Sequence, residues 1–592
     1  MTESSDLTMM PRKAPGGIIA ATILGIMWLA IGATHLGEPG IAQFMVRVVG
    51  APFGALLTTL VWWLFFVRVP WLQKSLPIAA AVIAAAIVLI PKGANAMMYL
   101  FGFTPFLVSA WLGWIALTSG LPWAPRLAGL VVAVVASIGF FALVRIDGLD
   151  GDFATEYRWA WSPTAEDQVL AFQKVEISES TGKAIEKPAD VHPGPHDWPA
   201  FRGQARDGVV AGTSIATDWK ANPPKILWKH PIGPGWSSMA LFHGMLFTQE
   251  QRGEEELVVC YDAENGSQRW TFAVATRFNE AIAGPGPRAT PTYHDGKLLC
   301  QGANGHLVCL DAFTGSLLWK RDLRADTGAT VPSWGFSASP MVHNGMVAVY
   351  AGAKDKTLIA YKLDGGEPAW TSSRQGNAEQ SYASAQLVTL AGAPLLLIPT
   401  DQGTAAYDPD TGKLLWEHAW PTSGIVRCLQ PALVGGTDIV IGTGLGVGTQ
   451  RIRVERKDGN WATTEVWKTT QFKPYYNDMV VHDGHAYGFD NNFFCCVDLE
   501  NGKVKWKARG YGSGQVLLLA GQGLLLISTE KGELALVKAS PDAHAELGKI
   551  KVIDGKTWNH PIISRDRVYI RNGQEIACVK LPSQPTPAGG SK

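Results

Sequence analysis

Long apolar runs dominate the first quarter of the chain. Five of them lie between residues 16 and 145, and each approaches the roughly 20 residues that a helix needs to cross a membrane. The runs are GGIIAATILGIMWLAIGA, GAPFGALLTTLVWWLFFV, LPIAAAVIAAAIVLI, a stretch from about Met98 to Ser119, and LAGLVVAVVASIGFFALV. No run carries a charged residue in its middle, which argues against an ion pathway. The pattern predicts an α-helical membrane domain of five transmembrane helices that anchors the protein over residues 1–145.

Lysine and arginine are unevenly distributed over the ends of these runs. The basic residues at one set of ends are Arg12, Lys13, Arg68, Lys74 and Arg126, and those at the other set are Arg47, Lys92 and Arg145. The positive-inside rule favours the richer set on the cytoplasmic side. We therefore expect a multi-pass protein of the bacterial cytoplasmic (inner) membrane, in contact with the lipid bilayer. Everything after Arg145 is then on the extracytoplasmic, or periplasmic, side.

Residues 146–196 differ in composition from both of their neighbours. In SPTAEDQVLAFQ, Thr164 stands three residues before Asp167, a spacing typical of a helix N-cap, so a short helix is predicted. From residue 176 to residue 196 the chain is polar, contains three prolines and has no apolar period. This part is predicted to be a linker.

The remainder of the chain repeats one strand–turn–strand pattern. It occurs as CYDAENGSQRW, CLDAFTGSLLW, AYDPDTGKLLW and CVDLENGKVKW, and in AYKLDGGEPAW Lys362 replaces the aspartate. The aspartates can accept hydrogen bonds from the turn backbone, and the glycines supply a backbone conformation that is costly for other residues. These aspartates are Asp262, Asp311, Asp408 and Asp498, and the glycines are Gly266, Gly315, Gly366, Gly412 and Gly502.

The tryptophans measure the period of this repeat. Trp228, Trp270, Trp319, Trp370, Trp416, Trp467 and Trp506 follow one another at intervals of 42, 49, 51, 46, 51 and 39 residues. Such a period, with several strands in each unit, is typical of propeller blades. The last strands, RVYIRNG and EIACVKL, need an outer partner, and KILWKHPI at the start of the region can provide it and close the ring. The prediction is an all-β eight-bladed propeller over residues 197–582, with seven blades as the fallback, and a disordered tail over residues 583–592.

The repeated Asp, Gly and Trp resemble the pyrroloquinoline-quinone (PQQ) repeat, which quinoprotein alcohol dehydrogenases share with the barrel-assembly lipoprotein of the outer membrane. The resemblance covers roughly residues 197–582. It implies a propeller scaffold and no particular activity, because the motif residues lie on outer strands. A membrane-anchored glucose dehydrogenase of this class also has five N-terminal spans.

This resemblance makes PQQ with a calcium ion the candidate cofactor. Dehydrogenases of the class close a vicinal disulfide over the quinone, and Cys495–Cys496 is an adjacent pair. However, Cys260, Cys309 and Cys496 share one position, two residues before the turn aspartate, which belongs to a strand well away from the axis. A packing role is therefore favoured for these cysteines.

Other parts of the cofactor site of those dehydrogenases do not stand out in the sequence. Their tryptophan-containing floor motif, their calcium ligands and the surroundings of their catalytic aspartate have no clear counterpart. Asn477 and Asp478 could offer two oxygen ligands, but both belong to one blade, so an ordinary polar strand start is favoured. No catalytic residue and no metal ligand is assigned, and PQQ with calcium stays a candidate cofactor only.

The innermost strands begin near the mouth of the axial channel, where propellers commonly bind ligands. A recurring proline aligns these strand starts. The residues before it, or equivalent to that position, are Ser238, Thr290, Ser339, Ser384, Gln430, Asn477, Gly514 and His560. The residues two positions earlier are Trp236, Arg288, Ser337, Tyr382, Cys428, Tyr475, Gly512 and Trp558. Strand alternation directs both rows to the same side, which predicts a polar ring below a larger rim.

From these rows we predict a ligand-binding site at the channel mouth. Its candidate residues are Trp236, Arg288, Trp334, Tyr382, Arg427, Asn477, Trp558 and His560. The arginines can attract a carboxylate, and the aromatic rings can stack on a sugar, quinone or peptide ring. An equally open alternative is that these residues only satisfy strand ends around a water-filled hole. His560 is the one obvious base of the ring, and no Asp or Glu is spaced to orient it, so a structural hydrogen bond is favoured.

Composition narrows the class of function. The 51 basic and 51 acidic residues balance, which argues against a nucleic-acid partner. With 47% hydrophobic and 17% charged residues, the chain is not mainly disordered. The leading interpretation is a membrane-anchored extracytoplasmic propeller that acts as a binding or scaffold module, with other envelope proteins, a peptide or a small molecule as partners. The alternative is a membrane-bound PQQ-dependent dehydrogenase of alcohols or sugars.

Overall fold

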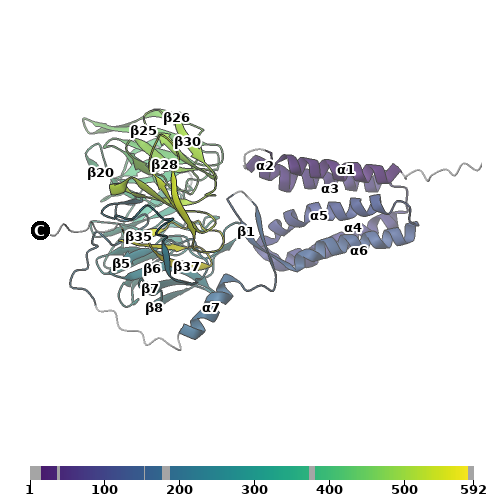
Figure 1. Ribbon diagram of the computed structural model, residues 1–592, viewed down its shortest axis with the longest axis horizontal. Coiled ribbons are helices and arrows are strands. Elements are labelled where there is room, and N and C mark those ends of the chain that lie inside the picture. The colour runs from purple at the N-terminus through teal and green to yellow at the C-terminus, as the bar shows by residue number, and fades with distance from the viewer. Residues whose placement is uncertain (1–14, 37–40, 152–153, 177–186, 373–379, 584–592) are drawn as a thin grey trace, which may run out of the picture. The chain divides into compact units, whose positions relative to one another are not determined.

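The chain forms two compact units in the computed structural model, which describes residues 15–36, 41–151, 154–176, 187–372 and 380–583. The first unit comprises Met1–Ser162 with Glu280–Ala283 and is mainly helical. The second comprises Pro163–Asn279 with Gly284–Lys592 and is mainly β-structure (Figure 1). Residues 177–186 of the predicted linker and residues 584–592 of the predicted disordered tail lie outside the described residues.

The first unit confirms five helical stretches that are long and apolar enough to cross a membrane. They are Gly16–Ala33, Ala42–Phe66, Trp71–Gly93, Ala96–Leu117 and Trp123–Ala142. The helices are α1 (Pro15–Ala33), α2 (Ile41–Met45), η1 (Val46–Gly50), α3 (Ala51–Val61), η2 (Trp62–Phe66), α4 (Trp71–Leu89), η3 (Ile90–Asn95), α5 (Ala96–Leu117), α6 (Trp123–Gly139) and η4 (Phe140–Ala142). Four basic residues expected in loops lie within helical stretches near their ends: Arg47, Lys74, Lys92 and Arg126. The Lys74 ammonium is satisfied there because it donates to the Leu64 carbonyl at 2.6 Å.

A hairpin that the sequence did not predict follows the fifth stretch. Its strands are β1 (Val144–Leu149) and β2 (Thr155–Trp159), and they pair antiparallel. The Tyr99 hydroxyl of α5 fixes the hairpin to the helices, since it donates to the Val144 carbonyl at 3.2 Å and accepts from the Ile146 N–H at 3.1 Å.

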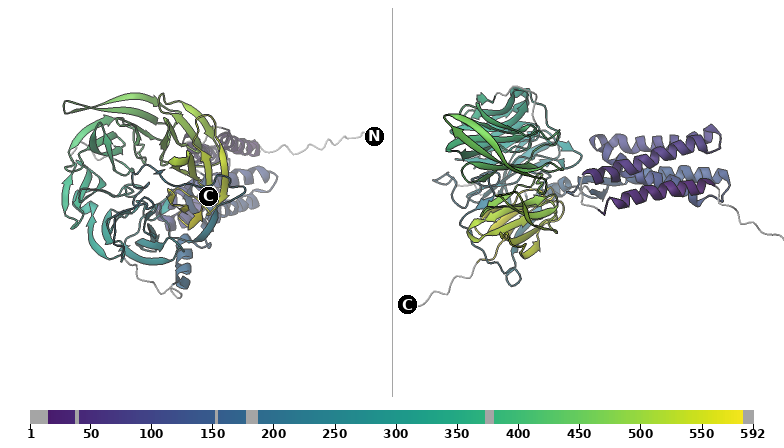
Figure 2. Two further views of the ribbon diagram at one scale, coloured as in Figure 1. Left: turned by 60° about the vertical axis from the view of Figure 1, so that its left-hand side comes forward. Right: turned by 90° about the horizontal axis from the view of Figure 1, so that it is seen from above.

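The second unit is an eight-bladed propeller, which confirms the predicted fold. Its blades surround a common centre (Figure 2, left). Blade 1 contains β5 (Ala240–Phe242), β6 (Met245–Arg252), β7 (Glu255–Asp262) and β8 (Gln268–Ala275); blade 2 contains β11 (Thr292–His294), β12 (Lys297–Gln301), β13 (His306–Asp311) and β14 (Leu317–Asp322). Blade 3 contains β15 (Met341–His343), β16 (Met346–Ala353), β17 (Lys356–Lys362) and β18 (Pro368–Thr371); blade 4 contains β19 (Gln386–Leu390), β20 (Ala393–Thr400), β21 (Gly403–Tyr407) and β22 (Leu414–Ala419).

The last four blades complete the ring. Blade 5 contains β23 (Ala432–Val434), β24 (Asp438–Thr443), β25 (Gly448–Lys457) and β26 (Asn460–Thr469); blade 6 contains β27 (Val480–His482), β28 (His485–Asp490), β29 (Phe493–Asp498) and β30 (Val504–Ala508). Blade 7 contains β31 (Gln515–Leu519), β32 (Leu524–Ser528), β33 (Glu533–Lys538) and β34 (Glu546–Lys551), with β3 (Val209–Val210) parallel to β31; blade 8 contains β35 (Ile562–Ser564), β36 (Arg567–Arg571), β37 (Glu575–Lys580) and β4 (Lys225–Pro231). The remaining elements are α7 (Ala165–Glu176), α8 (Leu323–Thr327), η5 (Ala520–Gln522) and the short pair β9 (Asn279–Glu280) and β10 (Gly284–Pro285).

Blade 8 closes the ring as predicted. Strand β4, from the start of the repeat region, pairs antiparallel with β37, from Lys225 opposite Lys580 to Pro231 opposite Glu575. Joining the two ends of the region in one blade removes the open sheet edges that a linear array would leave. The predicted cap of α7 is also confirmed, since the Thr164 hydroxyl accepts from the Asp167 N–H at 3.0 Å and the Asp167 carboxylate accepts from the Thr164 N–H at 2.8 Å.

The repeated Trp and Gly pack against each other between blades. Gly315 in blade 2 has a φ of +72°, and a Cβ there would lie 2.6 Å from the Trp270 ring of blade 1. The same arrangement joins Gly266 to Trp228, Gly366 to Trp319, Gly412 to Trp370 and Gly502 to Trp467. The repeat therefore works as a contact between successive blades, in which a flat ring covers a turn that has no side chain.

A carboxyl group is buried in blade 1. The Glu256 side chain is 4% exposed, and its Oε1 accepts from the Ala303 N–H at 3.2 Å. Burial raises the pKa of Glu256 to about 7. The folded protein therefore binds this proton more tightly than the unfolded chain, so the carboxyl lowers stability as the pH rises from about 4.5 to about 7.

We expect Glu256→Gln to raise the free energy of unfolding by about 3 kcal/mol at pH 8 and to change it little at pH 4, because each pKa unit corresponds to about 1.4 kcal/mol. Denaturant midpoints at the two pH values measure this difference. Glu255→Gln, at the exposed neighbouring position, is the matched control and should leave both midpoints unchanged. An equal gain for Glu256→Gln at both pH values would contradict the prediction.

Candidate functional site

A hydrogen-bonded belt joins the starts of the innermost strands. Its members are the eight residues predicted as the polar ring, Ser238, Thr290, Ser339, Ser384, Gln430, Asn477, Gly514 and His560, and all of them are buried. Backbone N–H groups of one blade donate to hydroxyls of the next, from Ser238 to Thr290 at 3.1 Å and from Thr290 to Ser339 at 3.0 Å. In blade 6, the Asn477 amide donates to the Gly514 carbonyl of blade 7 at 2.6 Å. The belt therefore uses its polar atoms to hold neighbouring blades together.

The rim above this belt is more open. Each of the eight residues two positions before the belt is partly exposed, whereas each belt residue is buried. This difference matches the alternation expected for residues on one side of a strand start. Side chains of the rim are therefore the ones that can reach a ligand.

Six aromatic rings meet at this mouth and form what we call the aromatic arc. It consists of Trp236, Trp558, Tyr476, Tyr475, Trp334 and Tyr382. Successive ring centroids lie 5.0, 5.0, 5.8, 6.1 and 4.9 Å apart. The contact of Trp334 with Tyr475 joins the loop before blade 3 to the start of blade 6, so the arc reaches across the mouth.

Two charged side chains border the arc. The Lys556 ammonium lies 4.5 Å from the centroid of the Trp558 ring and 5.5 Å from that of Trp236. Glu530 orients Trp558, because its Oε1 accepts from the indole N–H at 2.7 Å while its Oε2 accepts from the Ser513 N–H at 3.1 Å. The mouth thus combines flat apolar faces with a cation and a fixed indole.

The belt is bound from another direction by residues 197–210, which we call the axial plug. Arg206 of the plug is buried and donates to the carbonyls of Ala385 at 3.1 Å, Ser339 at 3.4 Å and Pro340, and to the Thr292 hydroxyl at 3.3 Å. Arg202 donates to the Met479 carbonyl of blade 6 at 2.6 Å. The plug therefore ties blades 2, 3, 4 and 6 together at the axis.

Further contacts extend the plug to the remaining inner strands. Trp198 exchanges backbone hydrogen bonds with Leu241 of blade 1, and the Phe201 ring packs edge-on against His560 of blade 8 at 5.0 Å. Strand β3 pairs with β31 of blade 7. Sequence reasoning missed the plug, although the close spacing of Arg202, Gly203, Arg206 and Gly208 in FRGQARDG was a visible signal.

A family model described as "Outer membrane protein assembly factor BamB", a PQQ-repeat model, matches residues 212–305 and 254–508. Together these matches span half of the chain. The chain belongs to this PQQ-repeat family. The resemblance inferred from the repeated Asp, Gly and Trp is thus confirmed.

Curated relatives of this PQQ-repeat chain include two quinohemoprotein alcohol dehydrogenases of Pseudomonas putida. ADH-IIG is 29% identical over 147 residues, which cover 22% of this chain and 19% of the relative. ADH IIB is 28% identical over 152 residues, which cover 22% of this chain and 20% of the relative. The chain thus matches about a fifth of the length of each relative. Among solved structures, BamB from Moraxella catarrhalis gives a TM-score of 0.45 at 12% identity, over 60% of this chain and 100% of that one. A europium-containing methanol dehydrogenase gives a TM-score of 0.43 at 12% identity, over 66% of this chain and 98% of that one.

The structure of the PQQ-repeat propeller separates the predicted ligand-binding residues into groups. Trp236, Trp334, Tyr382 and Trp558 meet in the aromatic arc, while Asn477 and His560 belong to the belt. The two arginines are held by backbone carbonyls. Arg288 donates to Gly284 at 2.8 Å and to Gly286, and Arg427 donates to Trp420 at 2.6 Å and to Thr400. Burial lowers the pKa of Arg427 to about 10. Sequence reasoning did not select Tyr476, Lys556 or Glu530.

One expectation about His560 is wrong, because an acidic residue does orient it. His560 Nε2 lies 3.4 Å from Oδ2 of Asp478, and both side chains are buried. Burial lowers the pKa of His560. Burial would raise the pKa of Asp478, but the charges of Arg202 and His560 outweigh this effect and lower it. The two residues come from blades 6 and 8, so sequence spacing could not reveal their contact. Arg202 Nη1 lies 3.7 Å from Asp478 Oδ1, so Arg202, Asp478 and the belt residue His560 form a buried cluster of ionisable groups.

Two parts of the cofactor site of the dehydrogenase class can be compared with this chain: the metal ligands and the adjacent cysteines. Within the described ranges, no three His, Cys, Asp or Glu side chains come close enough to hold a metal ion, and calcium needs six to eight oxygen ligands. Cys495 and Cys496 lie on β29, the third strand from the axis, and pack into different clusters of the core. Cys496 sits opposite Trp506, as Cys260 does opposite Trp270 and Cys309 opposite Trp319, so the predicted shared position is confirmed.

Proposed function

We propose that this PQQ-repeat chain is a membrane-anchored binding module whose aromatic arc holds a ring-bearing ligand, such as a sugar unit of a glycan or an aromatic side chain of a peptide or envelope protein. The observation that carries the proposal is the meeting of six partly exposed rings from five blades at one mouth. Aromatic faces of this kind stack on flat rings, and a bordering ammonium adds attraction for a carboxylate or hydroxyl.

The arrangement of the other polar groups supports binding over catalysis. Glu530 is committed to the Trp558 indole and the Ser513 backbone, and Asp478 lies in a buried cluster with Arg202 and His560. A general acid or base must reach the proton that it transfers. The aromatic rings, by contrast, lie where a ligand can touch them.

Titration of the purified full-length protein in detergent tests this proposal. Soluble oligosaccharides and aromatic tripeptides are the probes, and quenching of tryptophan emission with calorimetry is the readout. We expect saturable binding of one class and about a tenfold weaker affinity for Trp558→Ala, because a stacked aromatic contributes roughly 1–3 kcal/mol. Trp461→Ala, on the outermost strand of blade 5, should bind like the wild type. Equal weakening by both variants, or no saturable binding, would reject the site.

The alternative of a PQQ-dependent dehydrogenase is favoured by the 29% identity to a quinohemoprotein alcohol dehydrogenase over 147 residues. The same preparation, supplied with PQQ and calcium, is assayed for reduction of a dye by alcohols and sugars. Dye reduction that saturates with PQQ, together with a quinone absorbance that stays with the protein, would replace the binding-module proposal by this alternative.

We also propose that the propeller is extracytoplasmic and that the anchor lies in the bacterial cytoplasmic membrane. The support is the excess of Lys and Arg at the set of helix ends that includes the N-terminus, and the odd number of candidate spans. Protease added to intact spheroplasts should digest the propeller region, and digestion only after lysis would place it in the cytoplasm.

A further inference from the structure

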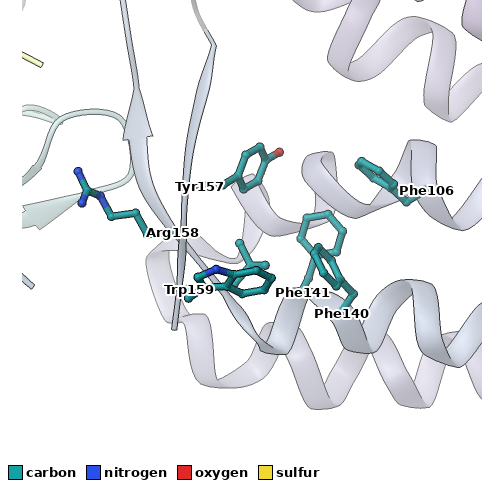
Figure 3. Close-up of a pocket in the computed structure, with 7 residues that line it drawn as sticks. Phe106, Phe140, Phe141, Tyr157, Arg158 and Trp159 are labelled. Carbon is teal, nitrogen blue, oxygen red and sulfur yellow. The ribbon is translucent and has the colours of Figure 1, made fainter. Parts of the chain in front are cut away.

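A cavity of about 400 Å³ lies in the helical unit, where the helices meet the β1–β2 hairpin. Its walls are the rings of Phe106 from α5 and Phe140 and Phe141 from η4, together with Val144, Tyr157, Arg158 and Trp159 of the hairpin (Figure 3). Pockets of roughly 300–1,000 Å³ are large enough for a small organic ligand. Nearly all of this wall is apolar, so the occupant must be apolar as well.

The hairpin that covers the cavity has two different faces. Val144 pairs with Trp159 and Ile146 with Tyr157, which puts these four apolar and aromatic side chains on the face toward the helices. Arg145 pairs with Arg158 on the other face. There Asp147 bridges both arginines, at 2.6 Å from Arg145 and 3.2 Å from Arg158. Figure 3 shows the Arg158 side chain on the opposite side of β2 from the Tyr157 ring.

The cavity belongs to the surface of the candidate spans. Phe106 lies within Ala96–Leu117 and Phe140 within Trp123–Ala142, yet each side chain is 48% exposed. Beside them, the Trp159 and Trp161 rings stack at 5.0 Å and are 47% and 67% exposed. Exposed tryptophans at the end of a span are typical of the membrane–water interface. The wall of the cavity is therefore continuous with the surface that faces lipid.

We propose that this cavity is a lipid site that takes one acyl chain of a bilayer phospholipid. The chain packs against Phe106, Phe140 and Phe141, and the hairpin lies in the interfacial layer. Its aromatic face covers the start of the acyl chain, where the Tyr157 hydroxyl and the Trp159 indole N–H can meet the glycerol esters. Its charged face, with Arg145, Asp147 and Arg158, points to water and headgroups. This site is separate from the ligand proposed for the propeller and does not depend on it.

Photolabelling of the full-length protein tests the lipid site. The probe is phosphatidylcholine with a diazirine in its acyl chain, mixed at low density into nanodiscs of unlabelled phosphatidylcholine, and labelled residues are mapped by mass spectrometry. Before illumination, the protein is extracted into mild detergent so that loosely held lipid is removed. We expect label at Phe106, Phe140 and residues 157–159 to exceed that at Phe65 and Phe66 about tenfold, although those two are even more exposed. Equal labelling of the two regions would overturn the proposal.

A variant and a second probe complete the experiment. Tyr157→Ala combined with Trp159→Ala opens the cavity and should lower its labelling about tenfold, while the matched pair Phe65→Ala and Phe66→Ala should leave it unchanged. A free fatty acid with the same diazirine distinguishes the source of the chain. If the fatty acid labels the cavity and excess phosphatidylcholine does not reduce this labelling, the phospholipid site is contradicted.

Discussion

Replacing Arg206 with methionine should lower the free energy of unfolding of the propeller by about 4 kcal/mol. Arg206 is buried at the axis and donates to acceptors in blades 2, 3 and 4. Methionine fills similar space but leaves these carbonyls and the Thr292 hydroxyl without their donor. Removing one partner from a buried charged network costs about 3–5 kcal/mol, since each buried group left unpaired costs about 1–3 kcal/mol. The denaturant midpoint, followed by tryptophan emission, measures the loss.

Arg565→Met is the matched control for this substitution. Arg565 also has a positive φ, +54° against +57° for Arg206, but it is exposed in a turn of blade 8. Both substitutions therefore change the same residue type in the same backbone conformation, and only one removes the axial contacts. The control should shift the midpoint little. Equal stability of the two variants would show that the plug does not fasten the blades.

Gly315→Ala should lower the free energy of unfolding by about 3 kcal/mol. The residue has a φ of +72°, and its new Cβ would lie 2.6 Å from the Trp270 ring. The left-handed backbone costs a residue with a Cβ about 1–2 kcal/mol, and overpacking costs about 1–3 kcal/mol more. The substitution therefore tests whether the repeated Trp and Gly form the joint between blades 1 and 2.

Gly345→Ala separates the two causes. Gly345 has nearly the same φ, +70°, but a Cβ there would meet nothing within 4 Å. Gly345→Ala should therefore lower the free energy of unfolding by only about 1 kcal/mol, the cost of the left-handed backbone conformation. If both alanine variants lose the same stability by denaturant unfolding, the contact of the tryptophan with the glycine turn contributes nothing.

The blades could be predicted from sequence because their signal is periodic. The Gly–Trp contact repeats at a nearly regular interval along the chain. An edge strand such as β37 needs a partner strand, and β4, from the start of the repeat region, is that partner. The plug has no such periodicity. Arg206 meets Pro340 and Ala385, which are 134 and 179 residues away, through contacts that occur once in the chain.

The mouth was partly predictable for the same reason. Strand alternation placed Trp236, Tyr382 and Trp558 on the rim, but it could not show that Trp334 reaches Tyr475 across the mouth. Nor could residue type alone show that Arg427 is buried against carbonyls. In the helical unit, composition predicted the spans. The β1–β2 hairpin is held by contacts that occur once, such as those of the Tyr99 hydroxyl and of the Phe141 ring with Tyr157.

The most direct test of the central claim is a cryo-electron microscopy map of the full-length protein with the probe that binds most tightly in the titration. The account predicts ligand density against the rings of Trp558 and Trp236, near the Lys556 ammonium, with the belt and the axial plug unchanged. Ligand density at the axis between the blades, with residues 197–210 displaced, would contradict it.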